Sequence, residues 1–143
     1  MSHDFIFEPG VWEGKGVISF SMAEDRLPFA MRWSVQPESD GKLCFSQLVE
    51  VEDFTENMSN HFSVTEVKSD SFLIKLENHL VGAIEGKGVI SPKALAWEFR
   101  ANEQGFEGFE IYEKTETGYK MRAEFTAGEG LRTFVFGELS RIS

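Results

Sequence analysis

Apolar and polar residues alternate in many short segments of this chain, and this alternation constrains the fold more than any other feature. In the segment FAMRWSV, residues 29–35, every second residue is a large apolar one. The segments LAWEF (95–99) and YKMRAEF (119–125) have the same period. A period of two places alternate side chains on opposite faces of a β-strand. Turn-forming residues separate these segments at short, even intervals, which is typical of antiparallel sandwiches and barrels.

We therefore predict an all-β chain of about ten strands. Residues 1–143 are expected to form one domain, since the length suits one and no linker or low-complexity segment divides the chain. The expected strands lie near residues 11–21, 27–36, 42–52, 58–68, 71–78, 80–91, 94–102, 106–115, 118–127 and 131–141. The least strand-like segments, 21–26 and 53–60, could each hold one helical turn. Because an open meander would leave unpaired edges, we expect closure into an up-and-down barrel.

The phrase EGKGVIS occurs twice, at Glu13–Ser19 and at Glu85–Ser91. Each copy is expected to form one strand, and a strongly alternating strand follows each of them. We interpret the chain as a five-strand unit taken twice, the alternative being a chance match. The two glycines of each copy share one face of their strand, where glycine permits a sharp bend or a close approach. A phosphate-binding glycine loop is excluded, because neither copy has the strand–loop–helix setting of that motif.

The chain carries a net charge of −10, from 24 acids and 14 Lys and Arg residues. Such a surface repels phosphate groups, which argues against nucleic acid and against an anionic membrane as partners. The single cysteine, Cys44, excludes an internal disulfide. Residues 1–10 contain acids and a proline where a signal peptide would have basic residues and an apolar core. We therefore expect a cytoplasmic protein with a structural thiol.

The residues PGVWEGKG open the first expected strand with Gly10, Val11 and Trp12. This resembles the Gly-x-Trp start of the calycin barrels, which include the lipocalins, the fatty-acid-binding proteins and the nitrobindin-like proteins. In lipocalins the tryptophan plugs the closed barrel end, and an arginine late in the last strand packs over it. The resemblance therefore implies that Trp12 and Arg141 form a barrel-end plug, with the guanidinium stacked on the indole in a cation–π contact.

Intracellular fatty-acid-binding proteins, with ten strands and a similar length, fit better than the eight-stranded lipocalins. The sequence departs from their pattern in two places. Residues 22–26 are too few for their helical lid, and the segment 132–134 only partly matches their carboxylate-binding Arg-x-Tyr. No position matches the proximal histidine of the haem-binding nitrobindins. The resemblance thus indicates a fold and leaves the ligand and any cofactor unknown.

Three aromatic residues, Trp33, Trp97 and Phe99, lie on the apolar faces of corresponding strands. Aromatic side chains at such positions fill protein interiors, but in a barrel of this size they can also form the walls of a ligand cavity. We expect all three to point inward and to line an internal pocket of a few hundred Å³.

The polar candidates for this pocket are Gln47, Tyr119 and Arg132. Gln47 and Tyr119 share faces with apolar residues, so each must find a partner in the backbone, in water or in a ligand. Arg132 would anchor an anionic ligand if it points inward and would be a surface charge if it points outward, and the periodicity does not decide between the two. Glu98 and Glu110 are acids or bases by type only, and we expect both on the solvated outer face.

No catalytic or metal-binding motif is evident. The histidines His3, His61 and His79 are scattered, without the three or four ligands that a metal site needs. The leading function is therefore the binding of a small apolar or amphipathic molecule inside a calycin-like barrel, as a carrier or sensor. The alternatives are an enzyme that uses the same cavity, with inward Arg, Tyr and Glu, and an interaction protein with a filled barrel.

Overall fold

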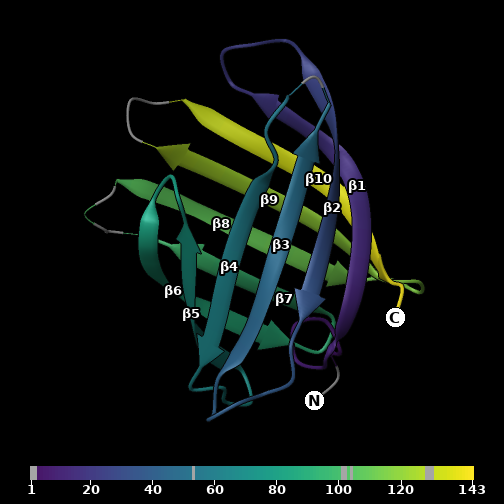
Figure 1. Ribbon diagram of the computed structural model, residues 1–143, viewed down its shortest axis with the longest axis vertical. Coiled ribbons are helices and arrows are strands. Elements are labelled where there is room, and N and C mark those ends of the chain that lie inside the picture. The colour runs from purple at the N-terminus through teal and green to yellow at the C-terminus, as the bar shows by residue number, and fades with distance from the viewer. Residues whose placement is uncertain (1–2, 53, 101–102, 104, 128–130) are drawn as a thin grey trace.

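Ten antiparallel strands close into a barrel in the computed structural model, which describes residues 3–52, 54–100, 103, 105–127 and 131–143. Each strand pairs with its neighbours in the chain, and β1 pairs with β10 to close the ring (Figure 1). The strands are β1 (Gly10–Phe20), β2 (Arg26–Val35), β3 (Leu43–Val51), β4 (Met58–Thr65), β5 (Ser71–Asn78), β6 (Gly82–Ser91), β7 (Ala94–Phe99), β8 (Phe106–Lys114), β9 (Tyr119–Ala127) and β10 (Arg132–Arg141).

The predicted fold is confirmed, and no expected strand end differs from the observed one by more than three residues. The described residues of the segments 21–26 and 53–60 form turns, bends and strand ends. Within the described ranges there is no helix of the length and apolarity that a membrane crossing requires.

The repeated sequence EGKGVIS lies in β1 and β6, which stand between the two groups of strands that cross each other in the barrel. In Figure 1, β2, β3 and β4 run upright in front, and β7 to β10 cross behind them. A methyl group at Gly16 would overlap the carbonyl oxygen of Phe136 on β10, and one at Gly88 would overlap the ring of Phe72 on β5. Glycine is therefore required where neighbouring groups approach these two strands most closely. The origin of the two halves from one repeated unit stays a prediction.

The interior is filled with aromatic rings toward the end where the chain begins. Trp33 and Trp97 are 0% and 1% exposed, and their rings lie 6.4 Å apart in an edge-on arrangement. Four further rings lie between 5.2 and 5.9 Å from that of Trp33, namely those of Phe5, Phe45, Phe62 and Tyr112. This packing leaves no unused apolar surface on the large rings, and we call this end of the barrel the closed end.

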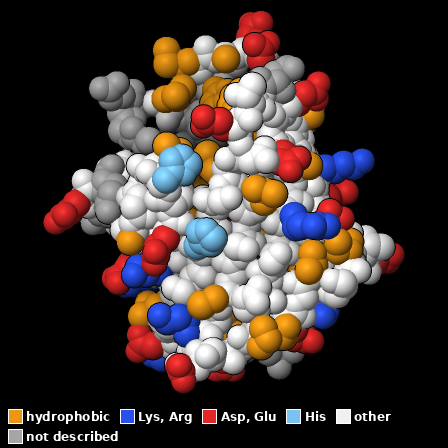
Figure 2. Space-filling view, viewed as in Figure 1, with side chains coloured by type: hydrophobic (Ala, Val, Ile, Leu, Met, Phe, Trp, Pro, Cys, Tyr) orange, Lys and Arg blue, Asp and Glu red, His pale blue; other side chains and the backbone are white. Residues whose placement is uncertain are grey.

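The opposite end of the barrel is packed less completely. Six inward-facing apolar side chains near it are only half-buried: Ile18, Val49, Val51, Val81, Phe106 and Phe125. This open end, defined by these six residues, lies where β1 connects to β2 and β3 to β4, at the top of Figure 1. Figure 2 shows hydrophobic side chains gathered at the same end of the molecule. Most of the half-buried apolar side chains that pack on the described core thus lie at this end, while two others, Phe7 and Ile90, lie toward the closed end.

Candidate functional site

A carboxyl group is buried in the middle of the barrel. Glu110 on β8 is 4% exposed, and it shares the inner face with Tyr112 because the two are separated by two positions. The Tyr112 hydroxyl donates to Glu110 Oε1 at 2.6 Å, and Trp97 Nε1 donates to Oε2 at 2.9 Å. Burial raises the pKa of the Glu110 carboxyl, while the two hydrogen bonds oppose that rise. Burial and the nearby Glu110 raise the pKa of Tyr112 well above its ordinary range.

The expected position of Glu110 on the outer face is wrong. The strand β8 carries Phe106 and Tyr112 on its inner face, but Phe109 and Ile111 on its outer face are half-buried as well. Since both faces are apolar, the period of the sequence could not assign the glutamate. The available signal was the spacing of Glu110 and Tyr112, which puts a carboxyl and a hydroxyl on one face. Glu98 does lie on the outer face, where it pairs with Arg100 at 2.9 Å.

A row of side-chain amides crosses the inner wall on three adjacent strands. Asn78 Nδ2 at the end of β5 donates to Asn60 Oδ1 on β4, and Asn60 Nδ2 donates to Gln47 Oε1 on β3, both at 2.9 Å. Asn60 and Gln47 are 9% and 7% exposed. Gln47 therefore points inward as predicted, and its carbonyl has a partner in Asn60, which sequence reasoning did not select. The row provides hydrogen-bonding groups that lead from the open end into the interior.

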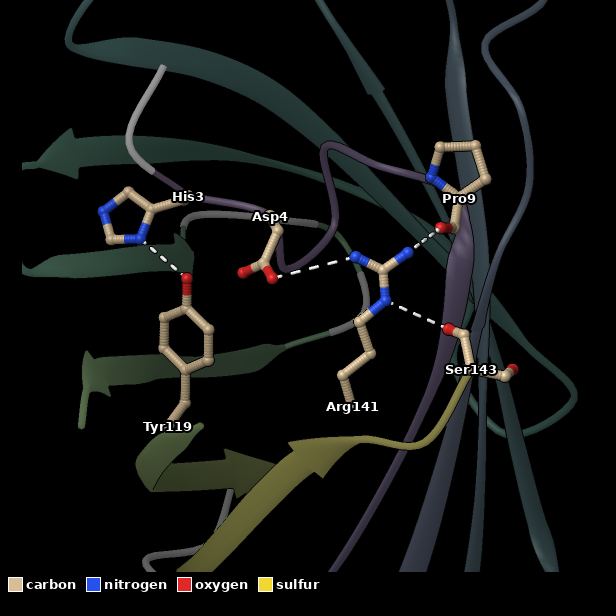
Figure 3. A network of polar contacts seen from close by, with 6 residues as sticks. All are labelled: His3, Asp4, Pro9, Tyr119, Arg141 and Ser143. Carbon is tan, nitrogen blue, oxygen red and sulfur yellow. Dashed lines mark hydrogen bonds and ion pairs between the residues drawn. The ribbon is translucent and has the colours of Figure 1, made fainter. Parts of the chain in front are cut away.

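The N-terminal segment folds back into the closed end as a plug. Phe5 is fully buried, with its ring 5.2 Å from that of Trp12 and 5.3 Å from that of Tyr119. His3 Nε2 donates to the carbonyl oxygen of Ser91 at 2.6 Å, and His3 Nδ1 forms a hydrogen bond of 2.8 Å with the Tyr119 hydroxyl (Figure 3). Burial and the charge of Asp4 raise the pKa of Tyr119 to about 12. Tyr119 thus points inward as predicted but belongs to the plug.

Arg141 ties this plug to the chain ends. Its guanidinium donates to the carbonyl oxygens of Pro9 at 2.8 Å and Ser143 at 3.0 Å, and it lies 3.8 Å from the Asp4 carboxylate (Figure 3). Trp12 is buried and pairs with Arg141 in the β1–β10 register, as the resemblance implied. The predicted cation–π stack is wrong, because the N-terminal segment draws the guanidinium outward and the ring of Phe5 packs against Trp12 instead.

The three predicted pocket aromatics all point inward. Trp33, Trp97 and Phe99 are each at most 1% exposed. They pack against other rings, however, and the ring of Phe99 lies 6.2 Å from that of Phe106. Three hollows of about 990, 590 and 440 Å³ are lined mainly by outward-facing side chains of the described residues, and none of them is lined by these three aromatics. The expected pocket walled by them is therefore corrected to a packed cluster, and a role of these residues in binding stays a prediction.

Arg132 lies on the outer surface, so it cannot anchor a ligand inside the barrel. It is exposed and pairs with Glu124 at 2.9 Å. The inward residues of β10 are Val135 and Leu139, at 9% and 3% exposure. The outer face of β10 also carries Phe136, which lines the largest of the hollows, and this is why both faces look apolar in the sequence.

Comparison with known proteins places the chain by fold alone. No family model and no curated protein sequence matches it. It is similar to the crystal structure of Rv2717c from M. tuberculosis, with a TM-score of 0.72, 11% identity, and 94% of this chain and 92% of that chain covered. It is also similar to the S-type phycobiliprotein lyase CPES from Guillardia theta, with a TM-score of 0.72, 10% identity, and 100% and 94% covered. The protein therefore has a calycin-like β-barrel fold, a closed barrel of ten antiparallel strands.

The buried Glu110 makes the stability of the barrel depend on pH. Its pKa is raised above the ordinary 4.5, so the native state binds this proton more tightly than the unfolded chain. Native stability is therefore lost as the pH rises from the unfolded value toward the raised one. Glu110→Gln cannot ionise, and its stability relative to the wild type should rise across this interval by at most about 1.4 kcal/mol per pH unit.

This prediction is tested by urea unfolding of both proteins between about pH 4 and pH 8. Glu98→Gln, on the outer face of β7, is the matched control and should not show such a rise. A stability difference between wild type and Glu110→Gln that does not change with pH would contradict the prediction.

Proposed function

We propose that this protein binds a small, largely apolar molecule inside the barrel, through its open end. The observation that carries the proposal is the half-burial of the six inward-facing apolar side chains that define the open end. Apolar residues that point into a barrel but stay accessible offer surface that core packing does not cover. Ligands commonly bind to concave apolar surface of this kind. The amide row and Glu110 supply the few polar points that orient a ligand in an apolar site.

The two alternative functions receive less support. An enzyme would be favoured by a buried glutamate or tyrosine beside an arginine, but the side-chain partners of Glu110 are Tyr112 and Trp97. An interaction protein would be favoured by a barrel filled throughout, but the apolar side chains at the open end are half-buried. The similar solved structures do not decide between these functions, since identities of 10% and 11% indicate the fold alone.

The test uses a neutral apolar dye whose fluorescence rises in an apolar environment. Val49→Asp places a charge among the half-buried residues at the open end of β3. Because a carboxylate in an apolar site must be desolvated, we expect the dye to bind about tenfold more weakly or not at all. The matched control is Val89→Asp, at a position on the outer face of β6 that is 59% exposed, and this variant should bind like the wild type.

Both variants are compared after circular dichroism shows that they are folded. Equal dye affinity in the two aspartate variants would place the binding elsewhere on the surface. A folded wild type that takes up no dye would overturn the proposal and favour the interaction protein.

A further inference from the structure

We propose that the ligand is a cationic amphiphile, in which an apolar chain or ring system carries a protonated amine or a similar group that Glu110 recognises. This inference rests on the proposed function, because it names the chemistry of the ligand for the same interior site. It departs from the expectation of an anionic ligand held by Arg132.

Among the residues that the structure describes, the interior contains a carboxyl group and no basic side chain that is free to bind an anion. Among the described residues, the buried polar or charged side chains are His3, Gln47, Asn60 and Glu110. Both ring nitrogens of His3 are already engaged at the closed end, by Tyr119 and Ser91. An anionic head group entering the barrel would therefore meet Glu110, and the ionised form of this carboxyl would repel it strongly in the low dielectric of the interior. A cation would be attracted by the same group.

Within the described part of the chain, Glu110 has two hydrogen-bond donors but no cationic side chain as a partner. Tyr112 and Trp97 both donate to it, as is expected for an acceptor that carries negative charge. A buried carboxylate without a cation is costly, and its raised pKa is the expected sign of that cost. Each carboxylate oxygen can accept two hydrogen bonds, so besides its tyrosine or tryptophan donor each has one acceptor position left for an N–H group of a ligand. A ligand cation would supply the missing counter-charge.

A ligand that reaches Glu110 from the open end has to displace side chains. The half-buried rings of Phe106 and Phe125 lie in its way. Phe125 packs directly against Gly108, and the fully buried Phe99 pairs with Gly108 from β7. Next to Glu110 on the inner face, toward the open end, comes Gly108, which pairs with Phe125 on β9, while Glu110 itself pairs with Ala123. The rings of Phe106 and Phe125 stack at 5.5 Å above this point. Both rings are only half-buried, so they can turn aside at less cost than a packed core residue. Their faces also attract a cation that passes them.

The connections around the open end are acidic as well. Their described residues include five carboxylates: Glu24, Asp25, Glu52, Glu56 and Glu103. The described arginines at this end are Arg26, Arg100 and Arg132, of which Arg100 pairs with Glu98 and Arg132 with Glu124. We call the five carboxylates in these connections the rim. Together with the net charge of −10, the rim attracts cationic ligands and repels anionic ones as they approach the open end. The rim charges are screened by salt, whereas a buried group is screened much less.

The experiment measures the displacement of the neutral dye by three ligands that share one dodecyl chain, all below their micelle concentrations. They are dodecylammonium, dodecanol and dodecanoate. At a salt concentration of about 0.5 M, which suppresses the effect of the rim, we expect dodecylammonium to displace the dye at about tenfold lower concentration than dodecanoate. Dodecanol should fall between the two.

Glu110→Gln keeps the size of the side chain and removes its charge, so in this variant the two charged ligands should differ by less than about threefold at the same salt. The matched control is Glu98→Gln, which should keep the preference of the wild type. If Glu110→Gln does not fold, the order of the three ligands on the wild type at high salt still decides the question.

The possible outcomes separate this inference from the proposed function. If no dye binds the folded wild type, both fail. If the dye binds but dodecanoate displaces it as well as dodecylammonium does at high salt, the ligand is not a cation and binding inside the barrel stands. If the preference for the cation vanishes at high salt, or survives unchanged in Glu110→Gln, then the preference comes from the rim carboxylates and the role of Glu110 is overturned.

Discussion

Replacing Trp97 with alanine should lower the free energy of unfolding by about 3–5 kcal/mol, the range for a large aromatic residue removed from a packed core. Trp97 is 1% exposed, and its ring lies between 5.0 and 6.5 Å from five others, those of Trp33, Phe45, Phe62, Phe72 and Tyr112. The substitution removes the contacts of the indole with all five rings. It also leaves Glu110 Oε2 without its donor, which adds to the loss.

Trp97→Phe separates these two contributions. It keeps an aromatic ring in the core but cannot donate to Glu110, so we expect it to recover part of the loss and still cost about 1–3 kcal/mol. Unfolding in urea measures both variants. Phe54→Ala, at a position that is 56% exposed, serves as the control and should change stability by less than about 1 kcal/mol. A Trp97→Ala protein as stable as that control would contradict the packed core described here.

The alternation of residue types predicted the fold because most strands have one apolar and one polar face. In β2, the four alternating residues Phe29, Met31, Trp33 and Val35 are all buried. Turn-forming residues predicted the strand ends, and the unpaired edges that an open meander would leave predicted closure of the barrel. These signals are local in the chain, and a meander needs only local connections.

The same signals failed where both faces of a strand are apolar. In β8 the periodicity therefore could not show that Glu110 points inward, and in β10 it could not show whether Arg132 points inward or outward. The period of two reports contrast between faces, so it cannot assign a polar residue when that contrast is absent. The expectation of an open pocket walled by large aromatic residues was wrong for a related reason. The sequence shows that such side chains point inward, but it does not show how closely they pack.

The N-terminal plug could not be found from periodicity at all. His3 contacts Ser91 and Tyr119, which lie 88 and 116 residues further along the chain. Phe5 and Ile6 form no strand, and their burial depends on a space that exists only once the barrel has closed. Contacts of this kind join distant parts of the chain through tertiary packing, and a segment without secondary structure carries no pattern that reports them.

Phe5→Ala should be the most damaging change in the N-terminal segment. Phe5 is fully buried, and its ring lies between 5.0 and 5.3 Å from four others, those of Trp12, Trp33, Tyr112 and Tyr119. Truncation of such a side chain typically costs about 3–5 kcal/mol. The next residue, Ile6, is fully buried with a φ of 62°, a backbone conformation that β-branched residues rarely adopt and that is unfavourable. The packing of Phe5 therefore has to offset strain in its neighbour.

Because the plug lies outside the strands of the barrel, it can undock before the barrel unfolds. Undocking in the variant would then reduce the measured loss of global stability. We therefore expect two measurements to respond together in Phe5→Ala. Urea unfolding should show the lower stability, and limited proteolysis should cleave the N-terminal segment faster than in the wild type. Met22→Ala, at a position that is 81% exposed in the β1–β2 connection, is the control. If Phe5→Ala resists both urea and protease as well as this control does, then Phe5 does not hold the closed end, and contacts such as those of His3 and Arg141 must hold the plug without it.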